Sequence, residues 1–412
     1  MKISESLIKT QKHTAKDETS RNAQLLTQGG FIYKNMAGVY SYTPIGLRVL
    51  NKIMGIIREE MDRIGAQELF LASLQDPQIW EKTERWSDEA IDVWFKTRLK
   101  NETEIGLATT HEEPLTEMLS HFIGSYKDLP RYLYQFQTKF RNELRAKSGL
   151  MRSREFIMKD LYSFSRSEAE LQEFYDQVIL AYSTIFQRLG LGEKTIITYA
   201  SGGSFSDFSH EFQTLTEAGE DTIYLDEEKG LAINKEVYSD EVITKLGLNK
   251  SRLVERKSVE VGNIFKLGTR FSETLGLGFT DEDGRKKPVV MGSYGIGPGR
   301  VMGTIAELHN DDQGLIWPEA VTPFQVYLIG LDTGSIEAEK IYRQLLESGV
   351  EVLFDDRDSA SPGEKFADAD LLGIPYRVVV SPKTVKENSI ELKSRQSSET
   401  ELIKFSELLE RI

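Results

Sequence analysis

The residues best suited to bind an anion are gathered in one short stretch, KFRNELRAKSGLMRSREF, from Lys139 to Phe156. Six of its residues are basic, although the whole chain is acidic, with a formal net charge of −14. Arg141 and Arg152 lie toward the two ends of the stretch. Arginine presents a planar fork of N–H donors that matches phosphate oxygens, whereas lysine would suffice for solubility. The pattern leaves two interpretations open, a phosphate-binding loop or a solvated hairpin tip.

A single carboxylate interrupts an otherwise apolar strand face. In EFIMKDLYSF, every second residue from Phe156 to Phe164 is apolar or aromatic except Asp160. Such alternation is typical of a strand with one buried face. A carboxylate on that face costs free energy unless it is paired. Asp160 is therefore either a structural hydrogen-bonding residue or an ammonium-binding group in a small pocket.

Glycines gather in GSYGIGPGR, from Gly292 to Arg300, ahead of an expected helix. Glycines in such a place let the backbone approach a ligand closely. The pattern is not a dinucleotide fingerprint, because its third glycine would fall on Arg300, and it lacks the Gly-Lys-Ser/Thr ending of a P-loop. What remains is an arginine presented near the start of a helix.

Two histidine motifs begin like a zinc-protease helix but lack its second histidine. Leu115 stands in that place after His111-Glu112, and Thr214 stands there after His210-Glu211. The chain has five histidines and no cysteine. We therefore expect neither a transition-metal site nor a disulfide.

The elements on either side of the basic stretch must position it. Residues 131–140 and 155–164 both alternate with period two, which predicts an antiparallel pair of strands. Residues 142–153 then form the joining loop, and loops of this length inside compact domains are often functional. Arg141 and Arg152 fall at the roots of this loop, where the strands would fix their positions.

Further elements follow from capping signals and periodicity. Thr43 and Pro44 open a helix that ends at Gly65. Ser167 and Glu170 form a capping-box pattern before a helix that ends at Gly190. Residues 201–212 are predicted to be an irregular loop, and 219–258 give few signals.

The rhythm changes beyond 314–323, which we interpret as a linker. Strands and helices then alternate, with strands expected at 324–331, 350–355 and 376–381 and helices at 336–348 and 364–372. This order predicts a small α/β domain around a largely parallel sheet.

Composition bounds the class of protein. A chain of 412 residues has room for two or three domains, and 39% hydrophobic with 28% charged residues is typical of a globular protein. No apolar run approaches the length of a membrane span, and the polar N-terminus has no signal core. With the absence of cysteine, this favours an intracellular, cytoplasmic protein.

Taken together, these motifs resemble the class II aminoacyl-tRNA synthetases. FRNE, a loop and RSREF match their second motif, GSYGIGPGR matches the third, and the helix from Pro44 with ELFLAS after it occupies the place of the first. TTHEE, MRSREFIMKDLYSF, SHEFQ, EVGNIFKLGTR and DDRDSASPGEKFADADLLGIP narrow the resemblance to prolyl-tRNA synthetases of bacterial type. The similarity covers nearly the whole chain.

The resemblance implies an α/β protein whose first part, 1–313, is an α+β catalytic domain with the antiparallel sheet of class II synthetases. Residues 219–258 would be a short remnant at the place of an editing insertion. After the linker, 324–412 would be an α/β anticodon-binding domain. The implied activity is ATP-dependent activation of L-proline with Mg²⁺, followed by transfer to tRNA(Pro), in a homodimer without membrane association.

It also implies roles for single residues. ATP would be bound by Arg141, Glu143, Arg152, Phe156, Glu260 and Arg300, with the three arginines acting in catalysis and Glu260 also meeting Mg²⁺. Proline would be bound by Thr110, Glu112, Met158, Asp160, Tyr162, Asn263 and Phe265. The tRNA would meet Arg145 at its acceptor end and Asp356, Arg357 and Lys365 on the anticodon side.

The sequence departs from the family pattern at several places. Ala72 replaces a proline of the first motif, Asn263 a histidine and Ser293 a cysteine, and FSDFSHEF replaces a glycine-rich approach to SHEF. The largest departure is the missing editing insertion. We therefore expect no hydrolysis of alanyl-tRNA(Pro) by this chain, and a separate editing protein or tolerated error.

Two other functions remain open at this point. A non-catalytic paralogue that binds tRNA would be expected to lose ATP-binding arginines, yet Arg141, Arg152 and Arg300 are present. A class II synthetase of other specificity is the second; threonine enzymes use a zinc site with cysteine, which this chain cannot supply. From Val321 onward there are seventeen acidic and eleven basic residues, so tRNA binding there would depend on a local basic face.

Overall fold

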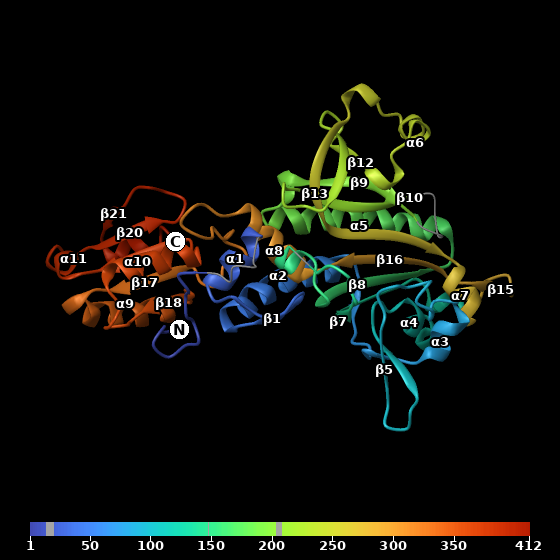
Figure 1. Cartoon of the computed structure of the whole chain (residues 1–412), viewed down its shortest axis with the longest axis horizontal. Helices are drawn as coiled ribbons and strands as arrows, with labels where there is room; N and C mark the ends of the chain where they lie inside the picture. Colours follow the sequence, from blue (N-terminus) through green and yellow to red (C-terminus); the bar gives the residue numbers. More distant parts are fainter. Residues whose placement is uncertain (14–19, 147, 203–207) are drawn as a thin grey trace. The chain divides into compact units, whose positions relative to one another are not determined.

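The computed structural model describes residues 1–13, 20–146, 148–202 and 208–412. The described residues form two compact units. We call Met1–Met36, Tyr40–Ile53 and Ile305–Ile412 the terminal unit, because it contains both chain ends. Ala37–Val39 and Met54–Thr304 form the central unit. Each unit has its own sheet (Figure 1).

A large mixed sheet forms the centre of the central unit, with the strand order β10-β9-β12-β11-β13-β16-β8-β7-β3. Its strands are β3 (Gln67–Glu68), β7 (Arg131–Phe140), β8 (Glu155–Ser165), β9 (Thr195–Ser201), β10 (Phe208–Leu215), β11 (Asp221–Asp226), β12 (Leu231–Asn234), β13 (Val254–Gly268) and β16 (Val290–Ile296). The run β13-β16-β8-β7 is antiparallel throughout. The strand pair predicted around the basic stretch is thus confirmed.

The alternation along β8 decides which residues face which side of this sheet. Lys159 and Leu161 lie on the side covered by α5 (Glu168–Arg188), where the Lys159 amino group donates to the Tyr182 hydroxyl. Phe156, Met158 and Asp160 lie on the other side, because successive side chains of a strand point to opposite faces. The carboxylate noticed in the sequence therefore faces away from α5.

Helices and small strands cover that second face. They are α3 (Pro77–Lys82), β4 (Leu74–Gln75), β5 (Phe95–Arg98), β6 (Glu104–Leu107), α4 (Glu112–Leu119), α7 (Arg270–Leu275), β14 (Gly278–Thr280) and β15 (Lys286–Pro288). Leu115 and Leu119 of α4 and Phe271 of α7 pack with Tyr162 and Met291 of the sheet in one buried apolar cluster. Burial of this cluster is the main favourable term that holds α4 and α7 against the sheet.

Residues 201–258 are more regular than the sequence indicated. Residues 203–207 lie outside the described residues, but Phe208–Leu215 form β10, so the prediction of an irregular loop up to 212 was wrong there. Beyond it, β11 and β12 join the central sheet, and α6 (Asp240–Lys245) packs on a small apolar core of its own. Many polar residues in short strands hid this pattern.

The terminal unit contains the second sheet, in the order β18-β17-β19-β20-β21. Its elements are α1 (Arg21–Gln28), β1 (Ile32–Met36), β2 (Val39–Tyr42), the first half of α2 (Pro44–Arg63), the end of α8 (Pro298–Leu308), β17 (Val326–Gly330), α9 (Ser335–Glu347), β18 (Val352–Asp355), α10 (Pro362–Leu372), β19 (Tyr376–Val380), α11 (Pro382–Lys386), β20 (Ile390–Ser394), β21 (Glu401–Ile403) and α12 (Phe405–Leu408). β17 pairs in parallel with β18 and β19, as predicted, and β20 and β21 extend the sheet in antiparallel fashion.

The segment 314–323, interpreted as a linker, is well packed. Leu315, Trp317 and Val321 are buried. Its backbone is tied to the end of α10, since Leu315 N donates to Leu371 O at 3.2 Å and Trp317 N to Gly373 O at 3.2 Å. This segment is therefore part of the body of the terminal unit.

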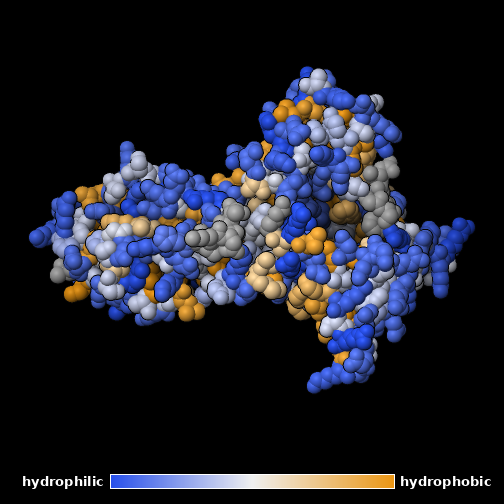
Figure 2. Space-filling model, viewed as in Figure 1, coloured by the Kyte–Doolittle hydropathy of each residue, from blue (hydrophilic) through white to orange (hydrophobic). Residues whose placement is uncertain are grey.

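Polar and charged side chains predominate on the face drawn in Figure 2, with apolar residues scattered among them. None of the described helices combines the length and apolarity that crossing a membrane would require.

Replacing Ser167 by Ala should destabilise the central unit by about 1 kcal/mol, because α5 loses its N-cap. The Ser167 hydroxyl accepts from Glu170 N at 3.3 Å, whereas the Glu170 carboxylate binds Arg166 N rather than closing the predicted capping box. Urea denaturation followed by circular dichroism measures the change. Ser183→Ala, in the same helix and bonded only within it, is the matched control and should leave stability nearly unchanged.

Candidate active site

The β7–β8 hairpin places the two ends of the basic stretch beside each other. Phe140 pairs with Glu155, and just beyond this pair Arg141 N donates to Arg154 O at 2.8 Å. Arg141 and Arg152 therefore stand at the roots of the loop, as predicted. Arg154 has a structural role in the hairpin, because its guanidinium donates to the carbonyls of Glu143 and Ala37.

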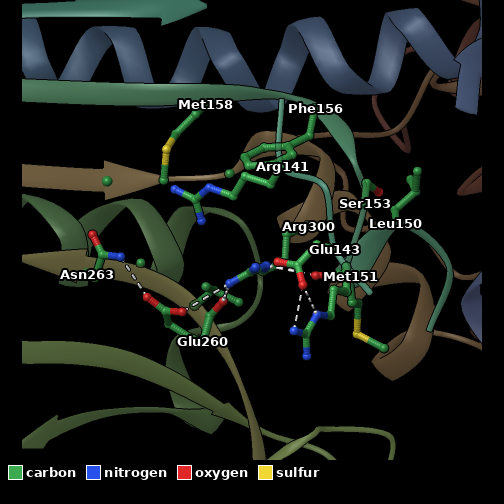
Figure 3. Close-up of a pocket in the computed structure, with 15 residues that line it drawn as sticks. Arg141, Glu143, Leu150, Met151, Ser153, Phe156, Met158, Glu260, Asn263 and Arg300 are labelled. Atoms are coloured by element: carbon green, nitrogen blue, oxygen red, sulfur yellow. Dashed lines mark hydrogen bonds and ion pairs between the residues drawn. The ribbon is translucent and has the colours of Figure 1, made fainter. Parts of the chain in front are cut away.

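A pocket that we call the arginine pocket lies against this hairpin (Figure 3). Every residue expected to bind ATP contributes to its lining: Arg141, Glu143, Arg152, Phe156, Glu260 and Arg300. The strand β16 leaves space for it. A Cβ at Gly295 would lie 2.8 Å from Asn263 Oδ1 and 2.9 Å from Met158 Cε, so only glycine fits there without displacing the lining.

The Arg141 side chain brings a positive charge into this pocket without a counter-ion. Its guanidinium carbon lies 5.4 Å from the centre of the Phe156 ring. Its Nε is buried and has no hydrogen-bond partner among the residues that the structure describes. Burial, and then the charge of Arg300, lower the pKa of Arg141, but a guanidinium stays protonated in proteins. Arg141 therefore offers an unshared charge to an anion.

The other two arginines are held by protein groups. Arg300 donates through Nε to Met151 O at 2.9 Å and through Nη1 to Glu260 O at 2.8 Å, with the Glu260 carboxylate at 3.2 Å. Arg152 donates to Glu143 at 3.0 and 2.7 Å and to Glu220 at 2.8 Å. These contacts fix the direction of both guanidinium groups.

A second pocket, the carboxylate pocket, adjoins the first and shares Arg141, Met158, Asn263 and Gly295 with it. All residues expected to bind proline line it: Thr110, Glu112, Met158, Asp160, Tyr162, Asn263 and Phe265. Glu112 is fixed by Thr110 Oγ1, which donates to it at 2.6 Å, and its other oxygen lies 3.4 Å from Ser293 Oγ. The arrangement presents carboxylate oxygens within partly apolar walls.

Sequence reasoning missed Arg85, which also lines the carboxylate pocket. Its guanidinium lies 2.8 Å from Glu113 and 3.6 Å from Glu112. Burial and then Glu112 raise the pKa of Glu113 to about 7 even though Arg85 opposes the shift. Arg85 lies in a tryptophan-rich loop without periodicity. Its closeness to the site is a tertiary contact that no local sequence pattern indicates.

Asp160 is paired, as the structural interpretation of the sequence required. Its carboxylate accepts from Gln135 Nε2 at 2.9 Å and from Lys139 Nζ at 2.9 Å. It nevertheless lines the carboxylate pocket, so the two interpretations are compatible. Lys139, for which the sequence suggested no role, is the partner that allows a carboxylate on this face.

No group of three or more His, Asp or Glu among the described residues could hold a metal ion by itself. Glu260 lies in the arginine pocket, where its carboxylate accepts from Asn263 Nδ2 at 2.7 Å. A magnesium ion bound mainly through phosphates needs only one or two protein carboxylates. Glu260 fits that requirement.

The positions expected to meet tRNA differ in accessibility. Arg145 is exposed in the loop, beside the exposed Leu144. Lys365 is buried, and its amino group donates to Gly330 O at 3.0 Å and Asp355 O at 3.3 Å, so the prediction that it contacts RNA was wrong. Arg357 is half-buried and ion-paired with Asp355 and Asp368 at 2.6 and 2.7 Å, and its expected contact with tRNA stays a prediction.

Asp356 is half-buried, like Arg357 and unlike the buried Lys365. Its carboxylate accepts from Ser4 N at 3.0 Å and Ser4 Oγ at 2.6 Å. Its expected contact with the anticodon therefore stays a prediction.

Comparison with known proteins places this geometry in a family. Residues 95–309 match the family described as the tRNA synthetase class II core domain (G, H, P, S and T), and residues 325–412 match the anticodon binding domain family. The proline–tRNA ligase of Methylobacterium sp. (strain 4-46) is 37% identical to this chain, in an alignment that covers 98% of this chain and 97% of the relative. The chain belongs to the prolyl-tRNA synthetases.

Other prolyl-tRNA synthetases agree in sequence and in fold. The enzyme of Rickettsia africae is 36% identical over 94% of both chains. The solved prolyl-tRNA synthetase of Cryptosporidium parvum, crystallised with L-proline and AMP, shares the fold with a TM-score of 0.77 at 21% identity, over 97% of this chain and 76% of that one. The enzyme of Giardia lamblia, in complex with prolyl-adenylate, gives a TM-score of 0.77 at 19% identity, over 93% and 74% of the two chains.

Membership of the prolyl-tRNA synthetases decides between the functions left open above. The chain is a proline–tRNA ligase of class II, and class II synthetases use ATP. The α/β fold class, with a class II catalytic core followed by an anticodon-binding domain, is confirmed as well.

Glu211, beside the arginine pocket, should make stability depend on pH. Burial and then Glu260 raise the pKa of Glu211 to about 8, against about 4.3 in an unfolded chain. The folded state thus prefers the protonated form. Its stabilisation is fully present below the unfolded pKa and is lost as the pH rises toward 8.

Glu211→Gln removes this titration while keeping an oxygen that can accept from Gln213 and Asn234. The free energy of unfolding of the variant, from urea titrations between about pH 5 and pH 8, should therefore fall less than that of the wild type. Glu217→Gln, at an exposed carboxylate of the turn after β10, is the control. Equal slopes for wild type and Glu211→Gln would contradict the assignment.

Proposed function

We propose that the two pockets are one continuous site in which proline is activated by ATP and then passed to tRNA(Pro). The observation that carries this proposal is Arg141. Its Nε is buried without a hydrogen-bond partner, no described carboxylate is ion-paired with it, and it lines both pockets. A reaction that joins the carboxylate of one substrate to the phosphate of another needs positive charge at such a junction.

In the first step, an oxygen of the proline carboxylate attacks the α-phosphorus of ATP. The bond to the β-phosphate oxygen breaks, and pyrophosphate leaves with its electron pair. Arg141 stabilises the charge that gathers on the α-phosphate. Because Arg141 is already oriented by the hairpin, little reorganisation accompanies the reaction.

Adenine would stack on Phe156 and meet Glu143, while Arg152 and Arg300 hold the phosphates. Arg152 is paired with Glu143 and Glu220. To bind ATP it would replace one or both of these carboxylates by phosphate oxygens. Glu260 would hold a magnesium ion together with phosphate oxygens, and this ion would neutralise charge on the pyrophosphate.

The carboxylate pocket would take the proline ring and its positive imino group. Thr110, Glu112 and Asp160 supply oxygens for the imino group, whereas Met158, Tyr162 and Phe265 supply apolar contacts and Asn263 lies at the junction with the other pocket. A site of this kind favours a ligand that combines a small apolar ring with a positively charged nitrogen.

In the second step, a hydroxyl of the terminal ribose of tRNA attacks the carbonyl carbon of the adenylate, and AMP leaves. Arg145, exposed on the loop, would contact the acceptor end. The domain 324–412 would contact the anticodon through Asp356 and a local basic face. Because phosphate contacts release counter-ions, we expect tRNA affinity to fall steeply with salt.

Two further properties concern assembly. Phe70, within the LFLAS segment, and Leu74, directly after it, are 76% and 58% exposed. Large apolar side chains at such exposure favour a protein interface, and we assign this one to a homodimer. We also place the enzyme in the cytoplasm, where its tRNA substrate is used.

The short segment 219–258 would leave editing to another protein. It folds as two strands and a helix of the central unit, with no domain of its own. The chain spans 97% of the Methylobacterium relative, so that relative has no room for a long additional domain either. Alanine fits any pocket that admits proline, and apolar pockets discriminate small differences by only about 10–200-fold.

Replacing Arg141 by Ala should lower proline-dependent exchange of pyrophosphate into ATP by about 10²-fold or more, because the charge at the junction is lost. The exchange assay with labelled pyrophosphate measures this effect, and circular dichroism checks the fold. Arg131→Ala, at the exposed opposite end of β7, is the matched control and should remain active. An Arg141→Ala variant with full exchange would refute the central role of this residue.

The purified enzyme should not deacylate alanyl-tRNA(Pro) faster than buffer does, because the segment 219–258 adds two strands and a helix to the central unit rather than an editing domain. Release of labelled alanine from preformed alanyl-tRNA(Pro) measures this rate. Alanine-dependent pyrophosphate exchange, run in parallel, should be detectable. A deacylation rate well above the buffer blank would show that this chain edits its own errors.

A further inference from the structure

Lys139 is a fully buried lysine, 0% exposed, directly behind the carboxylate pocket. It lies near the end of β7, in the cross-strand pair with Phe156 of β8. Cross-strand partners share a face, so Lys139 points to the same side as Phe156, Met158 and Asp160. Its amino group contacts both oxygens of Asp160 at 2.9 Å and also His111 Nδ1.

His111 must be neutral, with its proton on Nε2. Nε2 lies 3.0 Å from Ala72 O, a carbonyl that can only accept. Nδ1 then has a lone pair, and it accepts from the Lys139 ammonium. Burial, and then the charge of Lys139, lower the pKa of His111 to about 4, so the ring stays neutral at physiological pH.

Through these bonds Lys139 joins two walls of the carboxylate pocket. Asp160 belongs to β8, whereas His111 directly precedes Glu112 at the start of α4. His111 N also donates to the Tyr162 hydroxyl at 3.3 Å. The position of Glu112 relative to Asp160 therefore depends on what Lys139 holds.

The charges that face Lys139 come from every element around it. Asp160 acts on it from β8, His111 and Glu112 from the start of α4, and Arg141 from just beyond the end of its own strand. Burial lowers the pKa of Lys139, and Asp160 opposes this effect. A buried carboxylate is tolerated when a cation and hydrogen bonds accompany it.

We propose that Lys139 is a positioning residue for the amino-acid pocket, which holds the Asp160 carboxylate in place and fixes His111 in the tautomer that anchors Glu112. This inference rests on the proposed assignment of the carboxylate pocket to proline. Lys139 touches no substrate in this scheme. It sets where the carboxylates of Asp160 and Glu112 stand relative to the imino group.

The test is Lys139→Met, which keeps the length of the side chain and removes its charge. The KM for proline in pyrophosphate exchange should rise about tenfold or more, while the KM for ATP changes by less than about threefold, because coupled neighbours in one network interact strongly.

A double-mutant cycle with Asp160→Asn separates positioning from packing. If Lys139 acts through Asp160, Lys139→Met adds little to the KM for proline in the Asp160→Asn background. The double variant also removes both buried charges together, so it keeps the test open should the single variant fold poorly. Equal effects of Lys139→Met in both backgrounds would overturn the proposal.

Lys159→Met is the control for loss of a buried ammonium. Lys159 is also 0% exposed, but it faces α5 and binds Tyr182 and Tyr294 O rather than a carboxylate. It should lower thermal stability without raising the KM for proline. If wild-type enzyme shows no proline-dependent exchange, the proposed function fails; if it does and Lys139→Met keeps the wild-type KM for proline, only this inference fails.

Discussion

The buried charge of Arg141 is the constraint around which the central unit is arranged. A guanidinium cannot shed its proton to escape an apolar environment, so its position must be enforced by the rest of the fold. The β7–β8 hairpin enforces it by pairing the backbone of Arg141 with Arg154, and the Phe156 ring lies against it. The free energy that offsets the cost of this arrangement comes from apolar burial at other places, on the buried face of α5 and in the cluster between α4 and the sheet.

Three arginines in one site thus have three different environments. Arg300 is fixed mostly by backbone carbonyls, Arg152 by two carboxylates, and Arg141 by no polar group of the described chain. A charge bound to carbonyls keeps its full attraction for an anion, whereas a charge bound to carboxylates must be exchanged. In the proposed reaction, Arg300 would therefore hold phosphate from a fixed position, Arg152 would first exchange its carboxylates, and Arg141 would be available to the reacting phosphate.

Local signals predicted the elements that carry the motifs, because alternation and capping act over a few residues. The β7–β8 pair, α2 and α5 came directly from such patterns. The pattern of β7 was harder to interpret. Gln135, Gln137 and Lys139 alternate with aromatic residues, which suggests a solvated face, yet all three are buried on the side of the site. Their partners lie in distant segments, at Leu71, His111 and Asp160, and no local pattern records such pairings.

The same limit explains the error at Lys365 in the terminal unit. This basic residue of the DDRDSASPGEKF stretch was expected to meet RNA, but the structure buries its amine under two carbonyls, next to an Arg357 that is ion-paired with Asp355 and Asp368. Charge in a sequence does not distinguish a ligand contact from an internal one. That distinction depends on tertiary burial, which was visible only in the fold.

The direct pairing of β10 with β13 has a consequence for how this protein can change length. Leu215 and Ser258 are register partners, so the chain leaves β10 and enters β13 at neighbouring points, and the segment between them adds β11 and β12 to the same sheet. Closing a loop between adjacent ends costs little more as the loop grows, since the entropy rises only with the logarithm of its length. A turn within the 219–254 segment could therefore accept an inserted domain while β10 and β13, which carry Glu211 and Glu260, keep their pairing.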